Sequence, residues 1–284
     1  MIKNYYYLTK PGIIRGNLMT AAAAFLLAAG LNVDWWLLLA TLSGTGLVIA
    51  CGCVFNNYID RDIDRHMART KQRALVNDTV PVRSAMVYGT VLGLLGFTIL
   101  AAYTNLLTVG LGVVGLIFYV VIYGVAKRHS VHGTLVGTIP GATPTLAGYC
   151  AVTGSFDSGA VILFLIMMAW QMAHFYSIGL YRLQDYRKAG LPVMPVKWGP
   201  RPTKLQIMAY IVGSIAATTA LSGYGYTGYT YLVVMIALGL AWLGLGLRGF
   251  TTGDNQAWGR KMYSFSLLVL SSLSIMMAFN SLLS

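Results

Sequence analysis

Residues 56–65 read NNYIDRDIDR and stand at the end of a long apolar segment. The chain has no Glu and only eight acidic residues in all, yet Asp60, Asp62 and Asp64 fall within this one stretch. Lys and Arg residues recur between Arg61 and Arg73. Acids mixed with bases at the end of an apolar segment indicate a site for a metal ion and for phosphate.

Helical geometry separates the three acids. On a helix of about 3.6 residues per turn, positions four apart lie about 40° from each other, so Asn56, Asp60 and Asp64 share one face. Asp62 is offset from Asp60 and Asp64 by about 200° and points away from that face. Amide and carboxylate oxygens suit Mg²⁺, which commonly takes one or two protein carboxylates together with water and substrate phosphate. We predict that Asn56, Asp60 and Asp64 bind the metal; the alternative is that the acids only pair with neighbouring arginines.

The composition is that of a membrane protein. Of 284 residues, 57% are hydrophobic and 10% are charged, with a mean hydropathy of +0.67. A bilayer core of about 30 Å needs about 20 apolar residues per helical crossing. The sequence supplies about nine such stretches: 13–31, 35–59, 82–103, 106–126, 133–153, 159–180, 205–222, 229–247 and 262–279. We therefore predict an all-α polytopic membrane protein, with residues 1–284 forming a single domain of about nine transmembrane helices.

The positive charges follow the predicted topology. All 20 Lys and Arg fall at the N-terminal end or in the connections after the second, fourth, sixth and eighth stretches, helix ends included. Because basic residues accumulate on the cytoplasmic side of membrane proteins, the N-terminus is predicted in the cytoplasm and the C-terminus outside. The net charge of +12 therefore reflects orientation and anionic lipid headgroups, and it does not indicate a nucleic-acid partner.

Two long connections on the predicted cytoplasmic side, about residues 60–82 and 181–204, carry Asp among many basic residues. Long, charged connections are where function is expected, so we predict that they cap an active site on that side. Pro140 and Pro144 fall inside the fifth stretch, and we expect them to kink or break its helix at the wall of a cavity. Cys51, Cys53 and Cys150 are expected to be small buried residues.

A polar group also lies inside the sixth stretch, where Trp170 and Gln171 are followed by His174. An ionisable residue at membrane depth is a candidate functional residue; the alternative is a hydrogen bond to a neighbouring helix. Several tyrosines in the cytoplasmic halves of the spans offer electron-rich faces to a carbocation. They are Tyr58, Tyr119, Tyr123, Tyr176 and Tyr181.

The spacing Asn56-x3-Asp60-x3-Asp64, with RTKQR at 69–73, resembles the first aspartate motif of the UbiA-type intramembrane prenyltransferases. Further stretches are similar to the haem farnesyltransferases within that superfamily. These are TKPG at 9–12, KRHS at 127–130, WQM at 170–172 with His174, DY at 185–186 and PVMP at 192–195.

The resemblance implies an enzyme of the bacterial cytoplasmic (inner) membrane with Mg²⁺ as its cofactor. Its substrates would be farnesyl diphosphate and haem b. Farnesyl transfer to a haem vinyl group, with addition of water, would give haem O and diphosphate for respiratory oxidase assembly. A haem-copper oxidase or haem A synthase would be a further partner, alongside the lipid bilayer.

The resemblance also assigns roles to residues. Asn56, Asp60 and Asp64 would bind the metal and diphosphate, with the help of basic residues and of an acid from a second aspartate motif. These helpers are Arg69, Lys71, Arg73, Lys127, Arg128 and Asp185. Trp170, His174 and Tyr181 would lie at the haem side. Ala189 stands where the second motif has its second Asp, so a second metal site is expected to be missing or depleted.

Two other functions remain open at this point. One is an aromatic prenyltransferase of quinone biosynthesis, which shares the first aspartate motif. The other is a membrane transporter whose basic cytoplasmic face carries an anionic substrate. Acids on one helical face disfavour anion transport unless a metal ion intervenes.

The predicted orientation has a direct test. A reporter that is active only outside the cytoplasm should work when fused after Ser284 and should fail when inserted within residues 69–76, because the basic connections stay in the cytoplasm. The reverse pattern of activity would overturn both the orientation and the cytoplasmic placement of the site.

Overall fold

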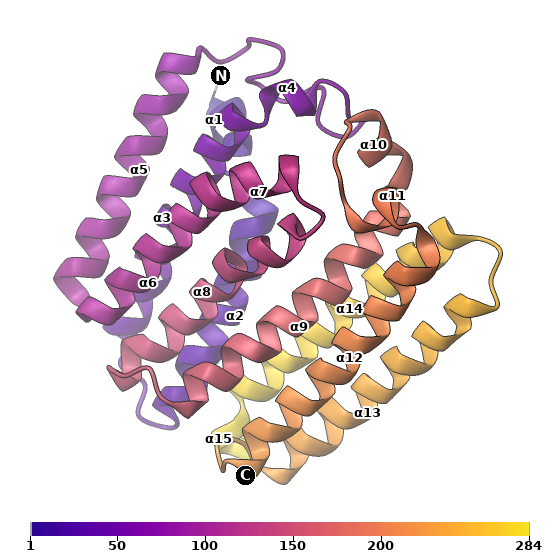
Figure 1. Cartoon of the computed structure of the whole chain (residues 1–284). Coiled ribbons are helices and arrows are strands. Elements are labelled where there is room, and N and C mark those ends of the chain that lie inside the picture. Colours follow the sequence, from indigo (N-terminus) through magenta and orange to yellow (C-terminus); the bar gives the residue numbers. More distant parts are fainter. Residues whose placement is uncertain (1, 284) are drawn as a thin grey trace.

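The computed structural model describes residues 2–283, which form a helical bundle (Figure 1). Its long helices are α2 (Pro11–Ala29), α3 (Trp35–Ile59), α5 (Val82–Tyr103), α6 (Leu106–Ile117) continued by η1 (Phe118–Ile122) and α7 (Tyr123–His129), α8 (Gly133–Thr153), α9 (Ser158–Tyr181), α12 (Pro200–Gly223), α13 (Tyr229–Leu247) and α14 (Asn255–Ala278). Eight of these segments are long and apolar enough to cross a membrane. With α8, they correspond to the nine predicted stretches.

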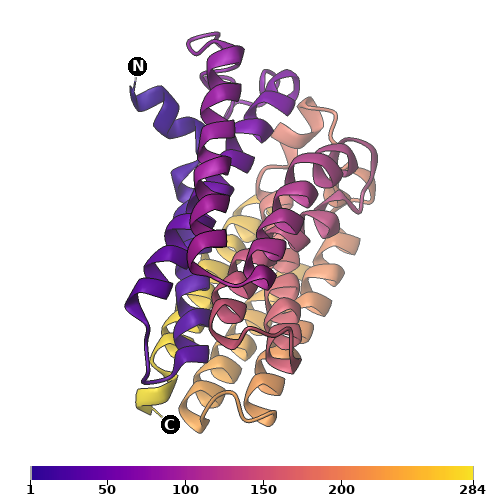
Figure 2. The ribbon, with the colours of Figure 1, turned by 90° about the vertical axis from the view of Figure 1, so that its left-hand side faces the viewer.

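Short helices lie at the two ends of the bundle. They are α1 (Ile2–Leu8), α4 (Arg61–Asp64), α10 (Leu183–Lys188), α11 (Met194–Lys197), η2 (Arg248–Phe250) and α15 (Asn280–Leu283). The two chain ends lie at opposite ends of the bundle, as an odd number of crossings requires (Figure 1). A view turned by 90° shows the same separation (Figure 2). The orientation relative to the membrane stays a prediction, and its reporter position Ser284 lies outside the described residues.

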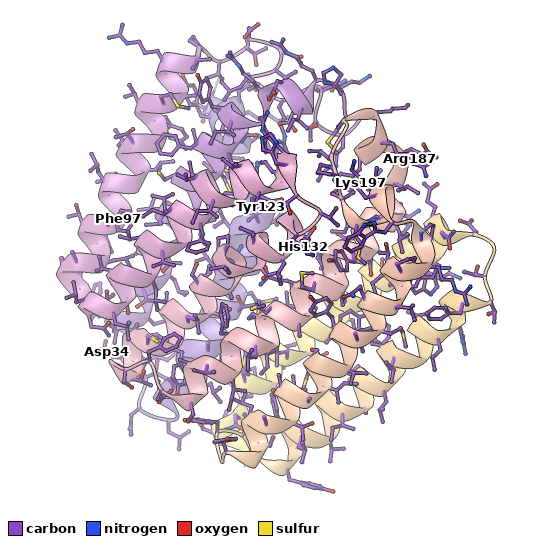
Figure 3. All side chains as sticks on the ribbon, in the orientation of Figure 1. Asp34, Phe97, Tyr123, His132, Arg187 and Lys197 are labelled. Carbon is purple, nitrogen blue, oxygen red and sulfur yellow. The ribbon has the colours of Figure 1, made fainter. Side chains whose placement is uncertain are left out.

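The two long connections predicted to cap a site lie at the same end of the bundle as α1 (Figure 1). Arg187 and Lys197 mark that end, whereas Asp34 lies toward the other one (Figure 3). The most extensive helix pairings are α3 with α5, α2 with α8, and α9 with α12. The bundle thus places the acid-rich end of α3 opposite the α10–α11 connection, although more than a hundred residues separate them in the chain.

Three of the eight acidic residues cap the N-termini of helices. Asp34 accepts hydrogen bonds from the backbone N–H groups of Trp36 and Leu37 at the start of α3. Asp157 and Asp254 cap α9 and α14 in the same way. Such caps contribute about 0.5–2 kcal/mol each. Asp60, by contrast, lies between α3 and α4, and Asp64 is the last residue of α4.

Pro140 and Pro144 do not break the fifth helix, because α8 continues through both. Both line a cavity, as predicted. Pro144 has no N–H to donate to the carbonyl of Pro140, and the hydroxyl of Thr143 donates to that carbonyl instead at 2.9 Å. Side-chain hydroxyls commonly satisfy backbone groups that a proline frees inside a membrane helix. The irregular turn is instead η1, a π-helical segment in the fourth stretch.

Helices α2 and α8 approach each other closely at small residues. The hydroxyl of Thr145 donates to that of Thr20 at 3.0 Å, and a Cβ atom at Gly148 would overlap the backbone carbonyl of Ala21. Small residues allow this packing in membrane helices. As predicted, the three cysteines are buried free thiols.

Gly148→Ala should destabilise the bundle, because its methyl group meets a backbone oxygen that has no room to move. Overpacking of this kind costs about 1–3 kcal/mol, which should lower the midpoint of thermal unfolding in detergent by several degrees. Gly110→Ala is the matched control, because a Cβ atom there meets nothing within 4 Å in the described part of the chain. Equal midpoints for the two variants would contradict the close approach of α2 and α8.

Candidate active site

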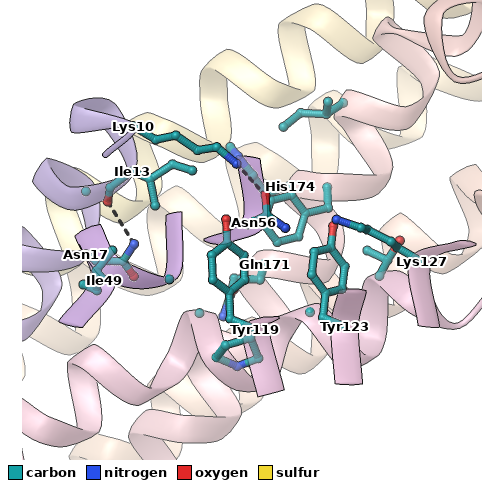
Figure 4. Close-up of a pocket in the computed structure, with 18 of the residues that line it drawn as sticks. Lys10, Ile13, Asn17, Ile49, Asn56, Tyr119, Tyr123, Lys127, Gln171 and His174 are labelled. Carbon is teal, nitrogen blue, oxygen red and sulfur yellow. Dashed lines mark hydrogen bonds between the residues drawn. The ribbon is translucent and has the colours of Figure 1, made fainter. Parts of the chain in front are cut away.

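A cavity of about 620 Å³ opens into the middle of the bundle. Side chains from α2, α3, α6, η1, α7, α8, α9 and α14 line it, together with the connections after α4 and α10. Its size lies within the range of about 300–1,000 Å³ that small-molecule sites occupy. Figure 4 shows polar groups gathered along it, with Lys10, Asn56 and Lys127 near one another.

Asn56, Asp60 and Asp64 all line this cavity. Helix α3 ends at Ile59 and α4 begins after Asp60, yet the helical hydrogen bonds continue across the junction. The N–H of Asp60 donates to the carbonyl of Asn56 at 3.0 Å, and that of Asp64 to the carbonyl of Asp60 at 2.8 Å. The three side chains therefore keep the common face that the spacing predicts.

Asp62 lies on the other side of this turn. Its side chain is 63% exposed and forms a two-pronged ion pair with Arg128, at 2.8 and 2.9 Å. The hydrogen bonds from this guanidinium lower the pKa of the Asp62 carboxyl to about 2. Arg128 also donates to the carbonyl of Ile59. It thus fixes the end of α7 against the end of α3 instead of lining the cavity.

Each cavity acid has a basic partner. Arg73 donates to Asp64 at 2.5 Å, and Lys127 donates to Asp60 at 2.5 Å. The Asp64 side chain is only 6% exposed and that of Asp60 13%. Arg69 lines the cavity as well. Two of the predicted basic residues thus pair with the two acids, Arg73 from the connection after α4 and Lys127 from α7.

Two other predicted residues lie outside the cavity lining. Lys71 is exposed, because the buried neighbour Thr70 turns inward and donates its hydroxyl to the carbonyl of Asp64. Asp185 lies on α10, where its neighbour Tyr186 lines the cavity instead. The roles assigned to Lys71, Arg128 and Asp185 stay predictions.

Lys10 is a cavity residue that the sequence reasoning did not select. Its Nζ donates to Oδ1 of Asn56 at 2.5 Å (Figure 4). Burial, together with the nearby charge of Arg73, lowers its pKa from 10.5 to about 8. The only signal in the sequence was its place in the TKPG stretch, where Pro11 begins α2 and Lys10 takes a left-handed backbone conformation with φ of 52°.

Aromatic rings form the wall below the acids. Tyr119 on η1 and Tyr123 at the start of α7 stack nearly parallel, with ring centroids 6.1 Å apart, and both point into the cavity (Figure 4). Tyr176 also lines it, whereas Tyr58 and Tyr181 do not. A π-helical turn often marks a functional site, and hydropathy gives no sign of one.

The polar group of α9 is fixed to α14. Trp170 donates its indole N–H to the carbonyl of Ser266 at 2.8 Å, and Nδ1 of His174 lies 2.6 Å from the Ser266 hydroxyl. That hydroxyl donates its single proton to the carbonyl of Tyr263, so Nδ1–H of His174 is the donor to it. The tautomer leaves a lone pair on Nε2 of a residue that lines the cavity.

The donor set fits a magnesium ion that arrives with phosphate. Among residues 2–283, no group of three or more His, Cys, Asp or Glu is arranged to hold a metal alone. Two carboxylates and an amide oxygen form an incomplete set of hard oxygen ligands, as is usual for Mg²⁺ sites completed by substrate. Nδ2 of Asn56 is buried without a hydrogen-bond partner in the described chain, which leaves this end of the cavity open to a further polar contact.

Comparison with known proteins gives consistent matches over nearly the whole chain. The model of the UbiA prenyltransferase family matches residues 17–272. A protein named protoheme IX farnesyltransferase from Sodalis glossinidius is 49% identical over 280 residues, which covers 98% of this chain and 94% of the relative. One of the same name from Klebsiella pneumoniae is 50% identical over 279 residues, covering 98% and 95%.

Solved structures share the fold at low sequence identity. A structure of digeranylgeranylglyceryl phosphate synthase superposes with a TM-score of 0.82 at 17% identity, covering 100% of this chain and 99% of the other. A UbiA homologue from Archaeoglobus fulgidus, bound to GPP and Mg²⁺, gives a TM-score of 0.72 at 16% identity, covering 97% and 99%.

The environment of Lys10 predicts an unusual reactivity. With a pKa near 8, Lys10 is charged and unreactive below that pH, and above it the neutral amine should react with acetic anhydride more readily than ordinary lysines do. Peptide mass spectrometry across pH 6 to 10 measures this, with the exposed Lys188 as the reference. A pH profile that matches that of Lys188 would contradict the burial of Lys10.

Proposed function

The chain belongs to the UbiA prenyltransferase family, and we propose that it transfers the farnesyl group of farnesyl diphosphate to a vinyl group of haem b. Water adds in the same overall reaction, and the products are haem O and diphosphate. The observation that carries this proposal is the 49% identity, over 98% of the chain, to a relative named protoheme IX farnesyltransferase. A quinone-forming prenyltransferase would share the fold without that degree of identity, and a transporter has no support among the relatives.

The diphosphate is proposed to bind at the acidic end of the cavity. Asn56, Asp60 and Asp64 would hold Mg²⁺, which when bound neutralises charge on the diphosphate. Arg69, Arg73 and Lys127 line the same end, so their positive charges face the phosphate oxygens. As the allylic C–O bond breaks, negative charge grows on those oxygens, and fixed cations stabilise it without having to reorganise.

Tyr119 and Tyr123 are proposed to stabilise the farnesyl cation. Both rings line the cavity and stack on each other, and aromatic π faces attract a cation. Apolar side chains continue the wall, among them Val48, Leu111 and Leu116. They suit the farnesyl chain and keep water from the cation before the acceptor attacks.

His174 and Trp170 are proposed to contact the haem. A vinyl carbon attacks C1 of the farnesyl cation, and the positive charge moves to the carbon next to the porphyrin ring. Water then forms a C–O bond there and releases one proton. The free lone pair on Nε2 of His174 is suited to accept that proton or to bind the haem iron. Holding Nδ1–H on Ser266 fixes the ring for either role.

The remaining assignments rest on this function. We propose that residues 1–284 act as one domain in the bacterial cytoplasmic membrane, with the connections near 60–82 and 181–204 closing over the bound substrates. Haem O would pass to a haem-copper oxidase or to haem A synthase. Ala189 in place of a second acid favours one magnesium site over two.

The proposal is tested with purified protein, farnesyl diphosphate and Mg²⁺, supplied with either haem b or 4-hydroxybenzoate. We expect a farnesylated product from haem b alone, and none when a chelator removes Mg²⁺. Prenylated hydroxybenzoate would indicate the quinone pathway. Absence of turnover with both acceptors would contradict the enzyme assignment.

The three neighbouring acids should differ in their effect on turnover. Asp60→Asn or Asp64→Asn removes a negative metal ligand from the cavity and should lower kcat by about 10²–10³, the usual cost of a lost preorganised electrostatic contact. Asp62→Asn removes only an exposed pair, worth about 1 kcal/mol or less, and should cost about tenfold or under.

Turnover of the three variants is compared at saturating Mg²⁺, with expression and thermal unfolding measured in parallel as controls for folding. If Asp62→Asn lowered kcat as much as the other two substitutions, the common face of Asn56, Asp60 and Asp64 would not explain which acids bind the metal.

A further inference from the structure

Aromatic rings form a connected series from the cavity toward the end of the bundle that carries α10. The rings of Trp170 and His174 stack with centroids 4.7 Å apart, and His174 lies 5.1 Å from the ring of Tyr263. Tyr263 in turn stacks on Tyr181 at 6.5 Å, with planes inclined by 21°. The first three line the cavity and Tyr181 lies beyond it. The series runs between α9 and α14.

Two arginines end this series. The guanidinium carbon of Arg182 lies 4.3 Å from the centroid of the Tyr181 ring, and that of Arg260 lies 5.9 Å from the same centroid. Among residues 2–283, neither has an acidic side chain within ion-pair distance. Two like charges therefore share one ring without a counter-ion, an arrangement that a bound anion stabilises.

The backbone fixes the two arginines relative to each other. Arg182 directly follows α9, and Arg260 lies in the second turn of α14. A Cβ atom at Gly259 would lie 2.9 Å from both the carbonyl of Ser177 and the N–H nitrogen of Tyr181. The helices thus touch at the residue before Arg260, so the separation of the guanidinium groups is a property of the helix packing.

We propose that Arg182 and Arg260 bind the two propionate carboxylates of haem b. This inference rests on the proposed function and adds the orientation of the acceptor. Haem carries both carboxylates on one edge of a flat aromatic ring. Guanidinium forks match carboxylates with two parallel hydrogen bonds, and the rings of Trp170, His174 and Tyr263 offer a surface along which the macrocycle packs.

This orientation has a consequence for the reaction. With the propionates held at Tyr181, the vinyl-bearing part of the ring points away from the end of the bundle and into the cavity. Tyr119 on η1 and Tyr123 on α7 line the same cavity. A vinyl group thereby faces the place where the farnesyl cation is proposed to form. The two arginines act as positioning and specificity residues, since they touch the substrate far from the reacting carbon.

The test compares haem b with its dimethyl ester, which keeps the ring and loses both negative charges. Arg182→Gln and Arg260→Gln should each weaken haem b binding about tenfold or more, as expected for a lost charge-assisted hydrogen bond, and leave the KM for farnesyl diphosphate unchanged. For the dimethyl ester, wild type and variants should bind equally. Arg182→Lys should restore part of the affinity. Arg201→Gln, an exposed arginine at the start of α12, is the matched control.

Binding is measured by absorbance titration of the purified protein with each porphyrin, so the result does not depend on turnover. Equal losses for haem b and its ester would show that the arginines only support the fold, and unchanged affinity for both would also overturn the proposal. Repeating the titration with vesicles that contain or lack anionic lipid tests whether lipid headgroups, instead of the haem propionates, are the anions that the arginines bind. If the variants changed only the response to anionic lipid, the site would bind headgroups. A wild type that binds haem b without forming product would overturn the proposed function and leave this site standing.

Discussion

The pairing of two buried carboxylates with two cations constrains the functional end of this bundle. Asp60 and Asp64 lie among apolar helices with Lys127 and Arg73 as partners, because an unpaired charge at that depth is unfavourable by several kcal/mol. Lys127 comes from α7 and Arg73 from the connection after α4. Both segments are therefore held over the end of α3, and the mouth of the cavity takes its shape from these pairs.

The same pairs prepare the cavity for the proposed substrates. Each carboxylate oxygen has two lone pairs, so acids that are paired with a cation can still bind a metal ion, and the cations keep further N–H groups for phosphate. The aromatic and imidazole groups of the cavity lie on other walls, with Tyr119 on η1, Tyr123 on α7 and the fixed imidazole of His174 on α9. The charged diphosphate is proposed to bind at one end of the cavity, and the apolar farnesyl chain and the haem ring are proposed to bind deeper inside. That division explains how one cavity can take a diphosphate and a porphyrin.

Local patterns in the sequence predicted the helices and the face shared by Asn56, Asp60 and Asp64, because hydropathy and the helical period are properties of neighbouring residues. Several features depended on distant contacts and were missed. Lys10 reaches Asn56 across 46 positions, Arg128 pairs with Asp62, and η1 has no signature in hydropathy. Pro140 and Pro144 line the cavity as predicted, but they do not break their helix, which the Thr143 hydroxyl helps to keep continuous.

We propose that Asp60 and Asp64 form half of a metal site whose other half is the substrate's diphosphate. The test is the binding of Mn²⁺, a paramagnetic substitute for Mg²⁺, measured by electron paramagnetic resonance with and without farnesyl thiodiphosphate. We expect weak binding of Mn²⁺ alone, tight binding with the diphosphate analogue, and loss of the tight binding in Asp60→Asn. Tight binding of Mn²⁺ without any diphosphate, or tight binding that survives Asp60→Asn, would contradict it.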